Sequence, residues 1–475
     1  MIIALDVLTV HCSFLRHLIA FHGLQYLYIY RCLRTPQAKF ISRASHRHHS
    51  LRPLTQAPRS ATMEAFMEKE RQVMEETSGD RESRKAGNFL KAEDGLPKDI
   101  GSRFNIPMFD RLTSYLGSQN PLAKDVDPAT EEVWLLDNTA YQPVHVYPHA
   151  PQPFQAQFVA AYFKKHTGTD VSKAVADIAD KLGLKDQDKT SAEATIAARL
   201  QPFVQTIAPA RSVNITLPNG TIHKLGPGGR SAVSEQLIPA LSDHANGSRA
   251  TIPAAIPDIT PHGPMLTHFA SPEGWAIISD IDDSIKITMT PFPLGILRST
   301  FVDDPTPIAG MPALYAHIHQ TLSPTWFYLS ASPYNLYPFL RLFLHTHYPP
   351  GTTILRDASW MDLGGFLSSL TQGTEAYKRS RIRKIHGWLP RRKILCVGDS
   401  TQSDPEAYGD VCRMFPGWVK AVFIRKVADV SEMEGTEKNS EGRFEKAFRG
   451  VPRGVWRIFE EPQELYEAVG QLKGM

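Results

Sequence analysis

The stretch AIISDIDDSIKIT, residues 276–288, decides the fold prediction. Its first four residues form an apolar run of the length of a buried β-strand, and acidic and hydroxyl side chains follow this run directly. Two similar runs occur downstream, at 326–329 and 393–397, and polar residues follow each of them. Because helical patterns separate the runs, the chain predicts a parallel sheet with helices on both faces.

The same alternation continues to the end of the chain. A fourth strand is predicted at 418–424, and a polar segment at 431–442 precedes a last strand–helix pair. The predicted helices of this part lie at 311–322, 336–347 and 374–388. Residues 266–475 are therefore expected to form an α/β catalytic domain.

An α+β module with an antiparallel sheet is predicted upstream, at 105–265. The apolar residues 133–136 indicate a strand, and Asn219-Gly220 between two alternating segments is typical of a β-hairpin. The predicted helices of the module lie at 154–165, 170–182 and 190–200. A stretch with four prolines, 253–264, is expected to connect the module to the catalytic domain.

The N-terminal part of the chain differs in charge from the rest. The 475 residues carry a net charge of +3, but residues 1–62 hold eight Lys and Arg against Asp6 alone. This leader is interpreted as a mitochondrial presequence, a disordered segment or a mis-annotated start before Met63. Residues 63–104 are expected to be helix and linker. Because the remainder is mildly acidic, a nucleic-acid binder held by a basic face is not expected.

The four cysteines are too few and too scattered for a disulfide framework or a zinc site of the CxxC type. A reducing compartment is the simpler interpretation. The chain is therefore expected to be cytoplasmic, or mitochondrial if the leader is a real presequence. The polar interruptions in the leader argue against a transmembrane helix.

Polar residues that follow the predicted strands carry the candidate chemistry, because ligands of an open α/β sheet bind beyond the carboxyl ends of its strands. Asp280 is placed to attack phosphorus and form an aspartyl phosphate, and Asp282 to protonate the leaving oxygen and then activate water. Ser330 is expected to bind the phosphate, and Lys378 to neutralise charge on the phosphate and the nucleophile.

Converging carboxylates repel one another unless a cation offsets their charge, so Mg²⁺ is predicted as cofactor. Asp280 and Asp399 are the expected side-chain ligands, with Asp404 as a ligand or in support. Each piece alone has a plainer interpretation, such as a helix cap for Ser330 or a solvated charge for Lys378. The ordered set along one chain favours the catalytic interpretation.

These residues resemble the haloacid-dehalogenase superfamily of Mg²⁺-dependent phosphotransferases and, more narrowly, the fungal phosphatidate phosphatases of the actin-patch type. The motifs that carry the resemblance are SDIDDSIKIT (279–288), WFYLSASPYNLYPFL (326–340), LRD (355–357), YKRSRI (377–382) and GDSTQSDPEAY (398–408). The upstream VWLLDNTAY (133–141) is similar to the non-catalytic domain of the fungal members.

The resemblance implies hydrolysis of phosphatidate to diacylglycerol and phosphate at a membrane surface, with the carbonyl of Asp282 as a further Mg²⁺ ligand. It leaves room for cytoskeletal or membrane-trafficking partners. Ser284 stands where the family usually has Thr. This exchange keeps the hydroxyl, so activity is still expected.

The spacing between the motifs adds an expectation about access. Ser330 follows Asp280 by 50 residues and Lys378 follows Ser330 by 48, which leaves room for a minimal cap only. An open site suits a lipid head group. The expected membrane contacts are the cations Lys286, Arg298, Arg379 and Arg381 and, unless they pack in the core, Phe292, Tyr334, Tyr337 and Phe339.

Other functions are compatible with the same residues. A phosphoprotein or small-molecule phosphatase would use the same scaffold. A catalytically weak adaptor at the membrane or cell cortex is the alternative from a different class.

Overall fold

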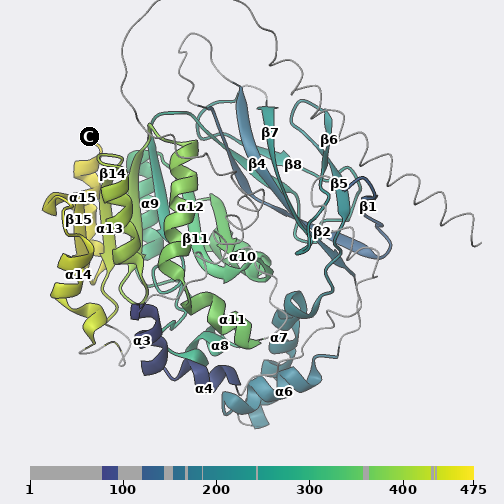
Figure 1. Ribbon diagram of the computed structural model, residues 1–475, viewed down its shortest axis with the longest axis horizontal. Coiled ribbons are helices and arrows are strands. Elements are labelled where there is room, and N and C mark those ends of the chain that lie inside the picture. Colours follow the sequence, from purple (N-terminus) through teal and green to yellow (C-terminus); the bar gives the residue numbers. More distant parts are fainter. Residues whose placement is uncertain are drawn as a thin grey trace, which may run out of the picture. The chain divides into compact units, whose positions relative to one another are not determined.

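The computed structural model describes residues 78–94, 120–143, 153–165, 170–184, 186–241, 244–356, 363–428, 433 and 436–475 (Figure 1). The predicted leader, 1–62, and Asp357 of the LRD motif lie outside these residues. Two helices, α3 (Ser78–Ala86) and α4 (Phe89–Asp94), occupy part of the segment predicted as helix and linker. No helix among the described residues is both long and apolar enough to cross a membrane.

A six-stranded parallel sheet forms the core of the C-terminal half, in the order β12–β11–β10–β13–β14–β15. The strands are β10 (Trp275–Asp280), β11 (Thr325–Pro333), β12 (Thr352–Arg356), β13 (Lys393–Asp399), β14 (Val419–Arg425) and β15 (Trp456–Phe459). β10 is buried over its whole length, as an apolar run between two neighbours requires. The predicted parallel sheet is therefore confirmed.

Helices pack on both faces of this sheet, and the side chains of β10 alternate between them. Ile277 joins one apolar cluster, whereas Ala276 and Ile278 join another on the opposite face. The first cluster includes residues of α8 (Pro293–Phe301), α9 (Met311–Leu322), α10 (Tyr337–His347), α11 (Leu363–Thr371) and α15 (Tyr466–Leu472). The second includes residues of α12 (Thr374–Trp388), α13 (Asp404–Met414) and α14 (Glu441–Ala447).

The upstream sheet has the path β2–β4–β3–β9–β8, with β7 paired to β4. Its strands are β2 (Glu131–Leu136), β3 (Asn138–Tyr141), β4 (Phe154–Lys164), β7 (Val233–Leu241), β8 (Arg249–Ile252) and β9 (Met265–Ala270). All its pairs are antiparallel except β3 with β9. Since β9 pairs with β3 and β8, this sheet extends to residue 270, just beyond the predicted module boundary at 265.

The predicted hairpin is present as β5 (Arg211–Thr216) and β6 (Ile222–Leu225), which pair antiparallel around Asn219-Gly220. β5 also pairs with β1 (Lys124–Asp125). The two helices predicted between the strands are α6 (Ser172–Lys181) and α7 (Asp186–Val204).

The helix predicted at 154–165 is wrong, because these residues form the strand β4. Phe154, Ala156 and Phe158 are buried, whereas Gln155 and Gln157 between them are only half-buried. This period of two is the signature of a strand, and β2, β3 and β7 all pair with it. Three alanines gave the segment a misleading helical propensity, which the sheet contacts override.

Candidate active site

The order of the strands brings the predicted residues together. β10 lies between β11 and β13, so the carboxyl ends of these three parallel strands are neighbours. Asp280 is the last residue of β10 and Asp399 the last of β13, while Ser330 lies within β11. Lys378 reaches the same place from α12, and Asp404 from the first turn of α13.

Three carboxylates form a compact cluster at this edge. Asp280, Asp399 and Asp404 each offer an oxygen atom within 4.8 Å of the others, and all three side chains are buried. The ammonium of Lys378 lies 2.6 Å from Asp280 Oδ1 and also contacts Asp404. One buried cation therefore serves three buried carboxylates, which leaves an excess of negative charge.

The electrostatics reflect this excess. Burial raises the pKa of Asp280 well above its usual value; Lys378 opposes the shift, and the neighbouring carboxylates add to it. Burial and the charge of Asp404 likewise raise the pKa of Asp399 to about 7. Burial acts to lower the pKa of Lys378, but the surrounding carboxylates outweigh it, so this pKa is raised.

The donor set fits a hard divalent cation. Carboxylate oxygens are the ligands that Mg²⁺ prefers, and a cation here would offset the charge that raises the pKa values of Asp280 and Asp399. The side chain of Asp282 is not part of this cluster.

Ser284 joins two of the carboxylates. Its hydroxyl lies 3.1 Å from Asp280 Oδ2 and 2.9 Å from Asp399 Oδ2, within donating distance of both. The exchange of Thr for Ser therefore keeps the polar atom that links the two strand ends.

Asp282 faces a different set of partners. Ser330 Oγ donates to Asp282 Oδ2 at 2.5 Å, and Thr288 Oγ1 donates to Asp282 Oδ1 at 2.9 Å. Both carboxylate oxygens thus have a hydroxyl donor, and the carboxyl group is held in one orientation. The Ser330 hydroxyl thus donates to Asp282, and it also accepts a hydrogen bond from the amide of Ser332.

The loop after Asp282 is organised by Asp283, whose carboxylate accepts hydrogen bonds from the backbone amides of residues 288–290. Thr290 also donates its hydroxyl to Asp283 and shares a 2.8 Å hydrogen bond with the hydroxyl of Thr401. The amide of Thr401 in turn donates to Asp399 Oδ1 at 2.6 Å. A chain of hydroxyl groups therefore connects this loop to the acidic cluster.

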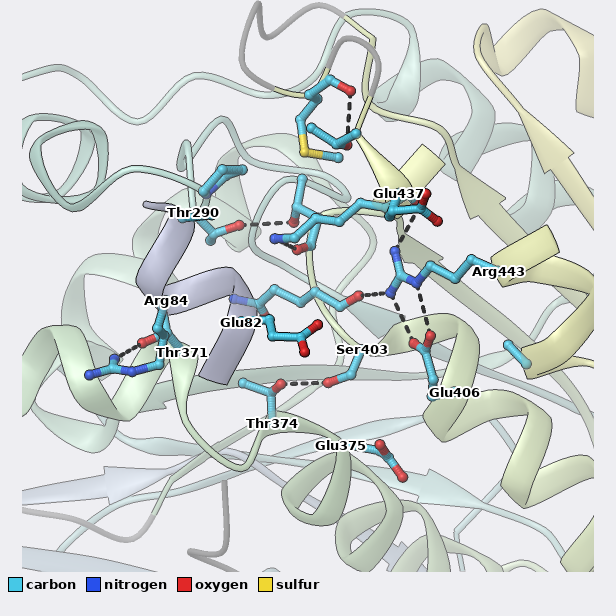
Figure 2. A pocket seen from close by; sticks show the side chains of 18 of the residues that line it. Glu82, Arg84, Thr290, Thr371, Thr374, Glu375, Ser403, Glu406, Glu437 and Arg443 are labelled. Atoms are coloured by element: carbon cyan, nitrogen blue, oxygen red, sulfur yellow. Dashed lines mark hydrogen bonds and ion pairs between the residues drawn. The ribbon is translucent and has the colours of Figure 1, made fainter. Parts of the chain in front are cut away.

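A pocket of about 1190 Å³ opens beside these hydroxyl groups (Figure 2). Thr290, Thr401 and Ser403 line it from the site. Ser403 shares a hydrogen bond with Thr374, and Arg443 contacts Glu406. Other walls come from α3, α4 and the segment 436–447, which all lie outside the intervals between the motifs.

The predicted side chains themselves are not exposed. All six are buried, none exposing more than 4% of its surface: Asp280, Asp282, Ser330, Lys378, Asp399 and Asp404. The spacings between the motifs measure only the insertions between them. They carry no information about α3, α4 and the C-terminal segment, which form walls of the neighbouring pocket.

The predicted membrane cations are only partly confirmed as surface groups. Lys286 is 1% exposed and points inward, so its assignment to the surface is wrong. Arg298 and Arg379 are partly exposed and pair with Asp303 and Asp410.

The predicted apolar contacts divide in the same way. Tyr334 and Tyr337 are buried in the core, as their alternative interpretation predicts, whereas Phe292 and Phe339 are half-buried. The exposed apolar residues near the site are instead Ile287 and Leu294.

No role was predicted for Asp283, Thr288, Thr290 and Thr401, although all four lie in or beside the quoted motifs. The sequence does carry a signal for these residues. In the loop that follows Asp280, a polar residue occurs at every second or third position.

Comparison with known proteins agrees with this geometry. Residues 275–426 match the model of a family described as phosphatidate phosphatase APP1, catalytic domain. The chain thus resembles APP1-type phosphatidate phosphatases. It is 30% identical over 198 residues to phosphatidate phosphatase APP1 of Saccharomyces cerevisiae, covering 41% of this chain and 31% of that protein.

A second relative is an uncharacterised protein of Schizosaccharomyces pombe, 28% identical over 174 residues, which cover 35% of this chain and 28% of that protein. The chain therefore matches about a third of the length of either relative. The family-model match spans β10 to β14 and contains all six predicted site residues. The resemblance predicted from the sequence is confirmed for this segment.

Proposed function

We propose that the chain is a Mg²⁺-dependent phosphatidate phosphatase of the haloacid-dehalogenase type. The observation that carries the proposal is the cluster of Asp280, Asp399 and Asp404 around Lys378, with Asp282 held separately beside it. This arrangement separates a group for attack from a group for proton transfer. The similarity to APP1-type enzymes supports phosphatidate as the substrate.

The residues divide the reaction into two steps. Asp280 Oδ forms a bond to phosphorus while the bond to the glycerol oxygen breaks, and the proton of Asp282 passes to that oxygen. Asp282 then takes a proton from the water that attacks the aspartyl phosphate. This releases phosphate and restores Asp280.

Asp280, Asp399 and Asp404, with the carbonyl of Asp282, would hold Mg²⁺, which neutralises charge on the transferring phosphoryl group when bound. Lys378 keeps Asp280 oriented and adds positive charge at the nucleophile. Ser330 has two roles in the proposal: it holds Asp282 and donates to a phosphate oxygen when substrate is present.

Attachment at the membrane surface is proposed through the exposed apolar residues after the motif. Ile287 is 39% exposed and Leu294 46%, and Phe292 between them lines the pocket. These residues would contact acyl chains while the phosphate of the head group reaches Asp280. A cytoplasmic enzyme bound peripherally to membranes follows from this proposal.

The experiment is a phosphate-release panel with Mg²⁺. It compares phosphatidate in mixed micelles with a soluble phosphopeptide and a hexose phosphate, each with and without excess EDTA. We expect turnover of phosphatidate that follows its surface mole fraction and stops with EDTA. The matched control, Asp280→Asn, should release no phosphate from any substrate, because an amide does not attack phosphorus.

Two outcomes would contradict the proposal. Equal rates on the phosphopeptide and on phosphatidate, independent of surface concentration, would favour a phosphoprotein phosphatase. Turnover that continues in excess EDTA would exclude the metal-dependent mechanism.

A further inference from the structure

Lys286 carries a buried positive charge that the reaction described above does not use. Its side chain is 1% exposed, and its ammonium donates to the carbonyl of Ile287 at 3.2 Å and to Thr288 Oγ1 at 2.9 Å. Both of these acceptors are uncharged. Burial lowers the pKa of Lys286, although Asp282 and Asp283 oppose that shift.

Burying an ammonium group without a directly bound anion costs free energy, so the position calls for an explanation. The ring of Phe339 lies 5.7 Å from the ammonium and compensates part of the cost. The remaining partner is Asp282, which the ammonium reaches through Thr288.

The direction of this hydrogen-bond chain follows from its chemistry. An ammonium only donates, and an ionised carboxylate only accepts, so the hydroxyl of Thr288 must accept from Lys286 and donate to Asp282. The alternative acceptor of the Thr288 hydroxyl, the carbonyl of Lys286, is farther away at 3.4 Å. Each hydrogen bond polarises the next in such a chain.

The backbone keeps the chain in register. Residues 282 and 286 form a parallel bridge, and Lys286 forms another with Pro307. The amide of Asp283 donates to the carbonyl of Lys286 at 2.8 Å. The side chain of Lys286 is therefore fixed behind the carboxyl group of Asp282 by the fold of the loop.

We propose that Lys286 and Thr288 are positioning residues that act on the reaction through Asp282. This inference rests on the proposed function and deepens it. When Asp282 gives its proton to the departing oxygen, negative charge appears on its carboxyl group. The hydrogen-bond chain from Lys286 through Thr288 holds that group in place and stabilises the new charge.

The variants that test this role remove one link at a time. Lys286→Met removes the charge but keeps the length of the side chain, and Thr288→Val removes the hydroxyl but keeps the shape. Each should lower kcat on micellar phosphatidate by about 10- to 100-fold with little change in KM, because general acid–base catalysis contributes ~10²–10⁴-fold. Thr288→Ser, which keeps the hydroxyl, should stay within about threefold of the wild type.

The double variant, Lys286→Met with Thr288→Val, shows whether the two residues act through one hydrogen-bond chain or independently. If Lys286 acts through Thr288, the double variant should be about as slow as the slower single variant. The matched control is Thr267→Val, a buried threonine of β9 whose hydroxyl has no hydrogen-bond partner among the described residues. It should change neither kcat nor the melting temperature by much.

An aryl phosphate provides a readout that a merely structural role would not produce. From p-nitrophenyl phosphate the nitrophenolate leaves without needing a proton. The burst of nitrophenol should therefore keep its rate in Thr288→Val, while the steady-state rate, which needs Asp282 to activate water, should fall. A structural loss would slow both phases.

Several results would overturn the inference: a kcat within threefold of the wild type in both single variants, a rise in KM alone, or a slowed burst. If Lys286→Met does not fold, Thr288→Val and Thr288→Ser decide the matter. If the wild type cleaves p-nitrophenyl phosphate but not phosphatidate, the proposed substrate is contradicted. The burst would still test the hydrogen-bond chain from Lys286 to Asp282. Cleavage of neither substrate would overturn both.

Discussion

At the end of β13, Gly398 gives Asp404 the space it needs. A Cβ atom at this position would lie 2.5 Å from Asp404 Oδ2 and 2.7 Å from its Cγ. The same Oδ2 accepts a hydrogen bond from the amide of Asp399 at 3.1 Å. A side chain at residue 398 would therefore push Asp404 away from the cluster.

Gly398→Ala should accordingly lower kcat by at least about 10-fold and destabilise the fold by about 1–3 kcal/mol through overpacking. Phosphate release and thermal unfolding measure the two effects. Gly387→Ala is the matched control, because no atom in the described part of the chain lies within 4 Å of a Cβ there. If Gly398→Ala behaved like this control, the close approach of Asp404 would have no importance for catalysis.

The positions of the site residues were predictable from the sequence, but their orientations were not. Asp280 and Asp399 follow apolar runs that predict strands of one parallel sheet, whose carboxyl ends share one edge. By contrast, the division of labour between Asp280 and Asp282 depends on the loop at 283–290, whose folding rests on side-chain hydrogen bonds. Lysine is rarely buried, so the sequence placed Lys286 at the surface.

At the scale of elements, the parallel sheet was predictable because its central strands are short, apolar and separated by helices. β4 was not, because its alanines and aromatics fit a helix as well as a strand, and only pairing with β2 and β7 decides between them. The packing of α3 and α4 also escaped prediction. Phe89 of α4 is 2% exposed and joins the apolar cluster of the parallel sheet, a contact that no local pattern announces.

At the scale of the whole described fold, one buried ion pair joins the upstream sheet to the catalytic part. Asp137, between β2 and β3, accepts hydrogen bonds from Arg341 of α10 at 2.8 and 2.9 Å. Arg341 also donates to the carbonyls of His262 and Pro264. Burial acts to raise the pKa of Asp137, but His345, Arg341 and the amide of Leu266 outweigh it, so this pKa is lowered.

Arg341→Met should lower the free energy of unfolding by about 3–5 kcal/mol, because it leaves the carboxylate of Asp137 buried without its partner. The control, Arg298→Met, removes a half-exposed pair with Asp303 and should cost no more than about 1 kcal/mol. Denaturant unfolding measures both values.

The pH dependence of the wild type provides a check on this ion pair. Since the pKa of Asp137 is lowered in the folded protein, its stabilisation is present above the usual carboxyl pKa of 3.8 and is lost as the pH falls below it. Arg341→Met should therefore lose less stability than the wild type between pH 5 and pH 3, about a unit on either side of that value. Equal losses of unfolding free energy in Arg341→Met and Arg298→Met would show that the pair of Asp137 and Arg341 does not hold the upstream sheet to the catalytic part.

In the proposed mechanism, Asp280 becomes phosphorylated by phosphatidate. The most direct measurement mixes the protein with Mg²⁺ and phosphatidate labelled on its phosphate, quenches with acid within milliseconds to seconds, and maps the label by peptide analysis. We expect an acid-stable, alkali-labile label on the peptide that contains Asp280 and no label in Asp280→Asn. Phosphate release without any protein-bound label, or a label that persists in Asp280→Asn, would contradict it.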